Sequence, residues 1–181
     1  MKKILLLLVL AISCLGFSQA TNGMSGLIHI PSARMLEDGQ LVLGAAFIPK
    51  PYFFRYGRNE NPGLNTYLTY GILPFVEVMF RYTHELNMPV NTSTRYFPDR
   101  MFGVRVRILE EKKLIPALVI GFQDPSSLFG TSEGATNYAS SYLVFSKYFN
   151  FDFGNFDFTL GYSQDFFDLR FKDLEGFFGG I

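Results

Sequence analysis

The stretch FVEVMFRYT, residues 75–83, decides the fold class because its side chains alternate in character with a period of two. One set of alternate positions is bulky and apolar, and it consists of Val76, Val78, Phe80 and Tyr82. The opposite set is Glu77, Met79, Arg81 and Thr83. Successive side chains of a β-strand point to opposite faces, so this pattern predicts a strand with two unlike faces.

The same alternation recurs along most of the chain. It is clearest in MFGVRVRIL (residues 101–109), IPALVIGF (115–122) and FDFTLGYS (156–163). Further strands are predicted at 40–47, 65–70 and 140–149, and residues 176–181 read as the opening of another. The 31 Phe and Tyr residues and 17 Gly residues support an all-β protein of about eight strands, because aromatic residues favour strands.

The connections between these strands alternate in length. GILP (71–74) and EEKK (110–113) are short, whereas residues 49–64, 84–100 and 124–137 form long connections. Short periplasmic turns and longer external loops are typical of outer-membrane proteins. We therefore predict an antiparallel up-and-down transmembrane β-barrel that is incomplete at the C-terminus. A soluble periplasmic β-sandwich or lipid-carrier barrel, with the bulky face turned inward, is the alternative.

The N-terminus predicts export. Two lysines precede the apolar run of residues 4–12, and Ser18-Gln19-Ala20 offers a cleavage site, so residues 1–20 are interpreted as a bacterial signal peptide. Residues 21–39, here called the lead-in segment, precede the barrel domain of residues 40–181. Lipoprotein processing at Cys14 is not expected, because Ala11-Ile12-Ser13 makes a poor lipobox. The predicted location is the bacterial outer membrane.

Composition excludes several function classes. The 16 basic and 16 acidic residues balance, so nucleic-acid binding is not expected. Cys14 is the only cysteine, and the two histidines, His29 and His84, lie far apart in sequence. No metal site, cofactor motif, nucleophile elbow or carboxylate pair is recognisable, so no metal, no cofactor and no enzymatic activity are expected. An enzyme acting on envelope polysaccharide is the third alternative.

Two groups of residues are candidates for a binding function. If the strands of residues 75–83 and 101–109 pair, four charges converge inside the barrel: Glu77, Arg81, Arg105 and Arg107. They would form either a lumen that attracts anionic sugars or an internal salt-bridge network. An aromatic cluster in the first long connection, Tyr52, Phe53, Phe54 and Tyr56, suits carbohydrate stacking or anchoring at lipid headgroups. Other aromatic residues near strand ends would form an interfacial girdle: Tyr67, Tyr70, Phe75, Tyr82, Tyr148 and Phe149.

The block GLIHIPSARMLEDGQL, residues 26–41, contains Gly-Leu-Ile, then Ile-Pro-Ser-Ala, then Asp-Gly before the first strand. In this order it resembles the entry segment of YjbH-like bacterial proteins, and the likeness continues to Tyr162. The resemblance implies an outer-membrane β-barrel associated with polysaccharide secretion. With no catalytic motif in the sequence, we predict that the protein assists exopolysaccharide or capsule export, or envelope assembly, without catalysis. The implied partners are the lipid bilayer, polysaccharide and envelope export proteins. No helix follows the glycines to hold an anion, so we interpret the lead-in segment as structural, tucked against or into the periplasmic end of the barrel.

Overall fold

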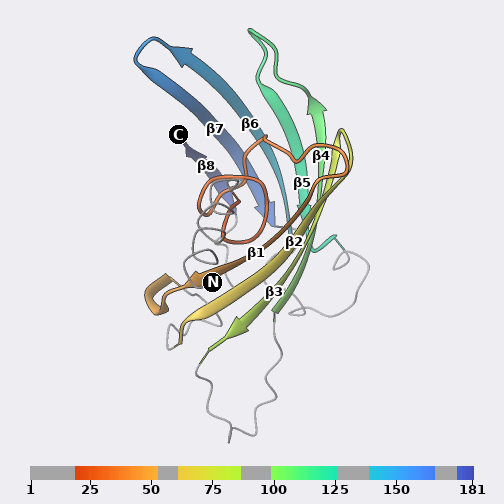
Figure 1. The fold of residues 1–181 in the computed structure, drawn as a ribbon, viewed down its shortest axis with the longest axis vertical. Helices are drawn as coiled ribbons and strands as arrows, with labels where there is room; N and C mark the ends of the chain where they lie inside the picture. The colour runs from red at the N-terminus through yellow and green to blue at the C-terminus, as the bar shows by residue number, and fades with distance from the viewer. Residues whose placement is uncertain (1–18, 53–60, 87–98, 126–138, 166–174) are drawn as a thin grey trace, which may run out of the picture.

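A computed structural model describes residues 19–52, 61–86, 99–125, 139–165 and 175–181. Within these ranges the protein is all-β, and its single antiparallel sheet has eight strands in the order of the sequence (Figure 1). The strands are β1 (Leu41–Ile48), β2 (Gly63–Leu73), β3 (Val76–Glu85), β4 (Asp99–Leu109), β5 (Ala117–Gln123), β6 (Ser140–Phe151), β7 (Gly154–Asp165) and β8 (Gly176–Gly180). A 3-10 turn, η1 (Lys50–Tyr52), follows β1. The predicted strands are therefore confirmed within a few residues.

The connections keep their alternation of length. β2–β3 and β6–β7 are joined by two residues each, Pro74-Phe75 and Asp152-Phe153, and β4–β5 by residues 110–116. Longer segments join the other pairs of strands. The predicted turn at residues 71–74 is wrong in position, because β2 continues to Leu73 through an irregularity between Gly71 and Leu73. All short connections therefore lie at one end of the sheet and all long ones at the other.

The sheet is curled, and its two faces differ as the alternation predicts. Its convex face exposes large apolar side chains, each 37–82% exposed. They are Leu41, Leu43, Phe47, Leu68, Tyr70, Ile72, Phe80, Phe102, Ile108, Leu143, Phe145, Phe149, Phe158, Leu160, Tyr162 and Phe177. The concave face carries Glu77, Arg81 and Arg105 among its buried residues. Two predicted girdle residues belong to this inner face: Tyr67, which alternates with buried Asn65 and Thr69, and Tyr148, which follows buried Val144 and Ser146 on the same face of β6.

The predicted barrel is present in part: its eight antiparallel strands form a sheet that does not close on itself in the part of the chain that the structure describes. The registers run from β1 to β8 in sequence, and none joins β8 to β1. β8 pairs with β7 over only five residues, from Gly176 to Gly180. The observed architecture is therefore a curled sheet with two edges, in the form of a partial barrel.

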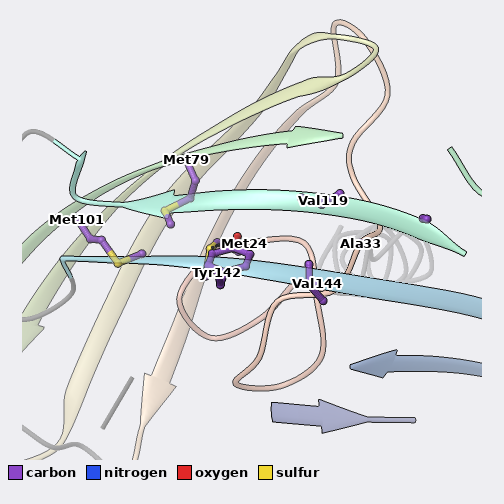
Figure 2. Packing of buried hydrophobic residues seen from close by; sticks show 8 residues of the cluster. Met24, Ala33, Met79, Met101, Val119, Tyr142 and Val144 are labelled. Atoms are coloured by element: carbon purple, nitrogen blue, oxygen red, sulfur yellow. Dashed lines mark hydrogen bonds between the residues drawn. The ribbon is translucent and has the colours of Figure 1, made fainter. Parts of the chain in front are cut away.

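The lead-in segment lies against the concave face (Figure 1), and Ala20, which precedes it, is fully buried. Side chains of the lead-in segment and of the sheet together form a small apolar core. The buried members of this core are Met24 and Ala33 of the lead-in segment with Met79, Met101, Ala117, Val119, Tyr142 and Val144 of the sheet (Figure 2). The concave face is thus a packed interior, in which small and flexible side chains make room for the crossing backbone.

At Gly71 the backbone of the lead-in segment approaches the backbone of the sheet closely. Gly39 N–H donates to Gly71 O at 2.8 Å, and Gly71 N–H donates to Gln40 O at 2.9 Å. A Cβ atom at Gly71 would lie 2.2 Å from the carbonyl oxygen of Glu37. Because that neighbour is backbone, it cannot move aside by a side-chain rotation.

A Gly71→Ala variant is therefore expected to lose about 1–3 kcal/mol of folding free energy through overpacking. The matched control is Gly103→Ala, since a Cβ there would meet the flexible Met79 Cε at 3.2 Å. Unfolding by denaturant, followed by far-ultraviolet circular dichroism, measures both. Equal midpoints for the two variants would contradict the contact.

No helix in the described ranges has the length and apolar character to cross a membrane. The predicted signal peptide lies almost entirely outside the described residues, as do Cys14, Phe53, Phe54 and Tyr56.

Candidate functional site

The centre of the concave face is an ion pair between neighbouring strands. β3 pairs with β4 so that Glu77 stands opposite Arg105, and Arg105 Nη1 lies 2.8 Å from Glu77 Oε1. The side chains are 0% and 1% exposed. The antiparallel register brings the charges together, and the alternation directs both of them to the same face.

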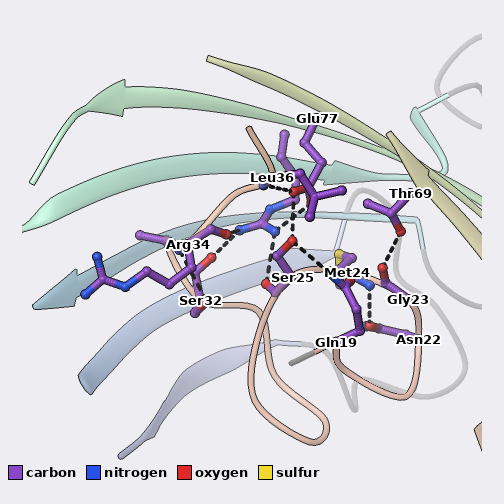
Figure 3. A network of polar contacts seen from close by, with 12 residues as sticks. Gln19, Asn22, Gly23, Met24, Ser25, Ser32, Arg34, Leu36, Thr69 and Glu77 are labelled. Carbon is purple, nitrogen blue, oxygen red and sulfur yellow. Dashed lines mark hydrogen bonds and ion pairs between the residues drawn. The ribbon is translucent and has the colours of Figure 1, made fainter. Parts of the chain in front are cut away.

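The lead-in segment supplies the remaining partners of this pair (Figure 3). Glu77 Oε2 accepts hydrogen bonds from Ser25 Oγ at 2.8 Å and from Leu36 N–H at 2.9 Å. Arg105 donates to the carbonyl oxygens of Ser25 at 3.0 Å, Arg34 at 3.1 Å, and Ser32. A buried ion pair is tolerated when further hydrogen bonds satisfy its charges, and here the lead-in segment provides them for both carboxylate and guanidinium, with Arg105 Nε left without a partner among the described residues. The pair therefore serves to hold the lead-in segment in the sheet.

The other two predicted charges do not join this pair. Arg81 of β3 is buried, and it lies nearer the long-connection end, where it lines a cavity. Arg107 of β4 lies near the short-connection end, and its Nη1 donates to Pro74 O at 3.1 Å. The four charges share one face, but they are distributed along it and do not form one cluster.

A second polar group, here called the Arg34 clasp, fixes the lead-in segment at the short-connection end. Arg34 donates from Nε and Nη2 to the two carboxylate oxygens of Asp157, at 2.8 and 2.7 Å, and from Nη1 to Glu111. Lys147 Nζ and Tyr148 N–H donate to Glu111 Oε1 at 2.8 and 2.9 Å. Three separated parts of the chain meet in this clasp. We did not predict it, although Arg34 is the only Lys or Arg residue in the lead-in segment.

Ionisation of Glu111 depends on the clasp. Burial would raise the pKa of Glu111, but hydrogen bonds from Lys147, Tyr148 and Arg34 outweigh this effect and lower the pKa to about 2. The pKa of Arg34 is raised, mainly through its hydrogen bond with Asp157. Each partner thus favours the charged form of the other.

The clasp predicts a loss of stability in acid. The pKa of Glu111 is lower in the folded chain than in the unfolded one, so its contribution is present above about pH 4.5 and falls as the pH drops towards about 2. Between pH 5 and pH 2 the wild-type thermal midpoint should therefore decrease more than that of Glu111→Gln. The neighbouring exposed Glu110→Gln is the control and should behave like the wild type. Parallel curves for the wild type and Glu111→Gln would contradict the assignment.

A cavity of about 330 Å³ lies at the long-connection end, between the lead-in segment and the concave face. Its wall combines amides and hydroxyls with a guanidinium and aromatic rings. The polar members are Thr21, Asn22, His29, Asn65, Arg81, Thr83, Gln123, Ser163 and Glu175, and the aromatic ones are Tyr52, Tyr142, Phe177 and Phe178. Residues from the lead-in segment and from strands distant in sequence therefore enclose one space.

This cavity joins two groups that the sequence treats separately. Arg81 was predicted as a lumen charge and Tyr52 as an aromatic binding residue, and both line the same wall. Gln123 and Tyr142 also line it, and neither was predicted, because nothing local in the sequence distinguishes them from other strand residues. Asn65 is held by Thr83 Oγ1 at 2.7 Å and donates to Thr21 O at 2.8 Å, so part of the wall is preorganised. Within the described ranges, no group of three His, Cys, Asp or Glu side chains is placed to hold a metal ion.

Comparison with known proteins supports the resemblance seen in the sequence. The family model described as "Exopolysaccharide biosynthesis protein YbjH" matches residues 18–170. The "Uncharacterized lipoprotein YjbH" of Escherichia coli (strain K12) is 29% identical over 152 residues, which cover 81% of this chain and 18% of that protein. The chain thus spans less than a fifth of the length of this relative. No solved structure matches. The resemblance to YjbH-like proteins is confirmed.

Proposed function

Because this chain belongs to the YjbH family of exopolysaccharide biosynthesis proteins, we propose that it acts in the bacterial outer membrane as a β-barrel segment. There it assists the export of exopolysaccharide, or the assembly of the envelope, through a binding or structural role rather than through catalysis. The partners of this role are the lipid bilayer, the polysaccharide and other envelope export proteins.

The observation that carries the proposal is the apolar convex face. Large apolar residues, Leu43, Phe80 and Leu160 among them, point away from the core on seven of the eight strands. Soluble monomers rarely expose a contiguous apolar patch of more than a few hundred Å². A transmembrane barrel turns such a surface to lipid and keeps polar residues inside. The sheet follows that rule, because polar Glu77 and Arg105 lie on its concave face and the large apolar residues lie on its convex face.

Two further features support a membrane orientation. The short connections all lie at one end of the sheet and the long ones at the other, as in outer-membrane barrels. The β6–β7 hairpin ends in a group of contacting phenyl rings: Phe149, Phe151, Phe153, Phe156 and Phe158. Aromatic residues at one level of the strands suit the boundary between lipid and water.

Membrane insertion imposes a condition on the edges of the sheet. Unpaired backbone groups do not occur in the hydrocarbon region, because each would cost several kcal/mol. The free edges of β1 and β8 must therefore pair in the membrane, with each other or with further strands. The lead-in segment occupies the concave face, so in the proposed role the interior of the barrel is filled. Polysaccharide then contacts the long-connection end of the barrel.

Attachment of lipid at Cys14 belongs to the proposal as well. The expectation against lipoprotein processing is not supported by the E. coli relative, whose name describes a lipoprotein. Cleavage before Cys14 would retain Gln19 and Ala20, whereas cleavage after Ala20 would remove them. Ala20 N–H donates to Met24 O, and Gly23 N–H donates to Ala20 O, both at 2.8 Å. These contacts support processing upstream of Gln19, and mass spectrometry of the mature N-terminus measures it.

Membrane fractionation of the producing bacterium tests the proposal. The full chain should sediment with the outer membrane, require detergent for release, and be needed for normal yields of exopolysaccharide. Recovery in the soluble periplasm without detergent would contradict the membrane role. An unchanged exopolysaccharide yield after deletion of the gene would contradict the export role.

A further inference from the structure

We infer that the cavity at the long-connection end binds one or two units of a neutral oligosaccharide. The inference rests on the proposed function and specifies the chemistry of the ligand. The cavity has a volume of about 330 Å³, at the lower end of the range of small-molecule sites, and this size fits a short segment of a sugar chain.

Two buried hydrogen-bond donors in the cavity wall, Tyr142 and Gln123, share one weak acceptor, a thioether sulfur. Tyr142 Oη donates to the Met24 sulfur at 3.2 Å, and Gln123 Nε2 donates to the same atom at 3.8 Å. Tyr142 is 3% exposed and Gln123 is 7% exposed. Buried polar groups normally find strong acceptors, and a thioether is a poor one. A hydroxyl oxygen of a ligand in the cavity would be a better acceptor for both groups.

One aromatic ring of the cavity wall is exposed and could stack on a ligand. Tyr52 lies in η1, it is 67% exposed, and it lines the same cavity as the buried donors. The apolar face of a sugar ring packs against such a side chain, while the hydroxyls at its rim form hydrogen bonds. Phe178, which contacts Tyr142 edge-on with ring centroids 6.4 Å apart, supplies a second apolar surface in the wall.

The charges of the wall favour a neutral sugar. Arg81 and Glu175 both line the cavity, so their charges offset each other. Amides and hydroxyls make up most of the remaining polar surface, and they can exchange hydrogen bonds with the hydroxyls of an uncharged ligand. A polyanion would be repelled by Glu175, and Arg81 is the one buried Lys or Arg side chain that the described part of this wall offers to attract it.

The test is titration of the detergent-solubilised full chain with cellopentaose and, separately, with a galacturonic acid pentamer, followed by calorimetry. We expect the wild type to bind cellopentaose at least as tightly as the acidic probe. Tyr142→Phe removes one hydrogen-bond donor and keeps the ring, so it should weaken binding about threefold to tenfold. Tyr52→Ala should weaken binding as well, and because its side chain is 67% exposed we expect little change in stability.

The matched control is Tyr148→Phe, which makes the same change on β6 at a position outside the cavity. It should bind as the wild type does. The inference is overturned if neither probe binds, if only the acidic probe binds, or if Tyr142→Phe and Tyr148→Phe bind equally. These results would leave the outer-membrane location untouched, since that is measured by fractionation. Conversely, a soluble periplasmic protein that still discriminates between the two variants would contradict only the proposed function.

Discussion

Replacement of Glu77 by glutamine is expected to cost about 3–5 kcal/mol of folding free energy, the largest effect of any single change considered. The variant removes one charge of a fully buried pair and leaves the Arg105 guanidinium without its counter-ion. It also weakens the acceptor for Ser25 Oγ and Leu36 N–H, so the lead-in segment loses part of its attachment. The chain contains no tryptophan, so far-ultraviolet circular dichroism in denaturant is the suitable measurement.

Arg107→Gln is the matched control for this prediction. Arg107 shares the strand and the face of Arg105, but its side chain donates to a backbone carbonyl, Pro74 O, and takes no part in the buried ion pair. The Arg107→Gln substitution should change the free energy of unfolding by about 0.5 kcal/mol or less. The double variant Glu77→Met/Arg105→Met should remain unstable, because it leaves lead-in carbonyls and the Leu36 N–H without partners. Full recovery of stability in the double variant would show that the pair acts without the lead-in segment.

Phe80→Arg is expected to destabilise the protein by about 2–4 kcal/mol in a lipid bilayer, the second large effect. Phe80 lies near the middle of β3 on the convex face, and it is 44% exposed. A guanidinium there would be placed in hydrocarbon if the convex face meets lipid. In a soluble protein the same change at an exposed position would alter stability by about 0.5 kcal/mol at most. Folding into lipid vesicles at increasing urea concentrations distinguishes the two outcomes.

Leu114→Arg provides the comparison for Phe80→Arg. Leu114 is 89% exposed, and it lies in the short β4–β5 connection, outside the strands. It should tolerate the charge whether the convex face meets lipid or water. Equal, small effects of both substitutions would argue for a soluble sheet and against a lipid-facing surface.

The strands could be predicted from the sequence because alternation is a local signal. In FVEVMFRYT the period of two assigns Glu77 and Arg81 to one face without any knowledge of the neighbouring strands. The antiparallel pairing of β3 with β4 then follows from their adjacency in the chain. The exact turn was harder to predict, since the irregularity that extends β2 to Leu73 depends on the pairing with β3.

The path of the lead-in segment could not be predicted in detail, because its contacts join residues far apart in sequence. Arg34 reaches Asp157 and Glu111, and Arg105 reaches the backbone of Ser32. One glycine of the family-like block does have a local explanation. A Cβ at Gly26 would lie 2.3 Å from the carbonyl oxygen of Ile30, so the tight loop from Gly26 to Pro31 needs a residue without a side chain.

The cavity illustrates a second limit of the sequence. Arg81 and Tyr52 were separate candidates because a strand and a long connection stand between them. Only the curl of the sheet brings them to one wall. Tyr142 and Gln123 are candidate donors to a ligand because both lie close to the Met24 sulfur, a weak acceptor. No sequence pattern predicts that proximity.

The central claim, that the convex face of the curled sheet meets lipid in a closed barrel, is tested most directly by gel mobility. The full chain, extracted from outer membranes in mild detergent, should run as a compact band without boiling and shift to its unfolded mobility after boiling. The compact band should also resist protease while the membrane is intact. A single mobility before and after boiling, from a protein recovered without detergent, would contradict the account.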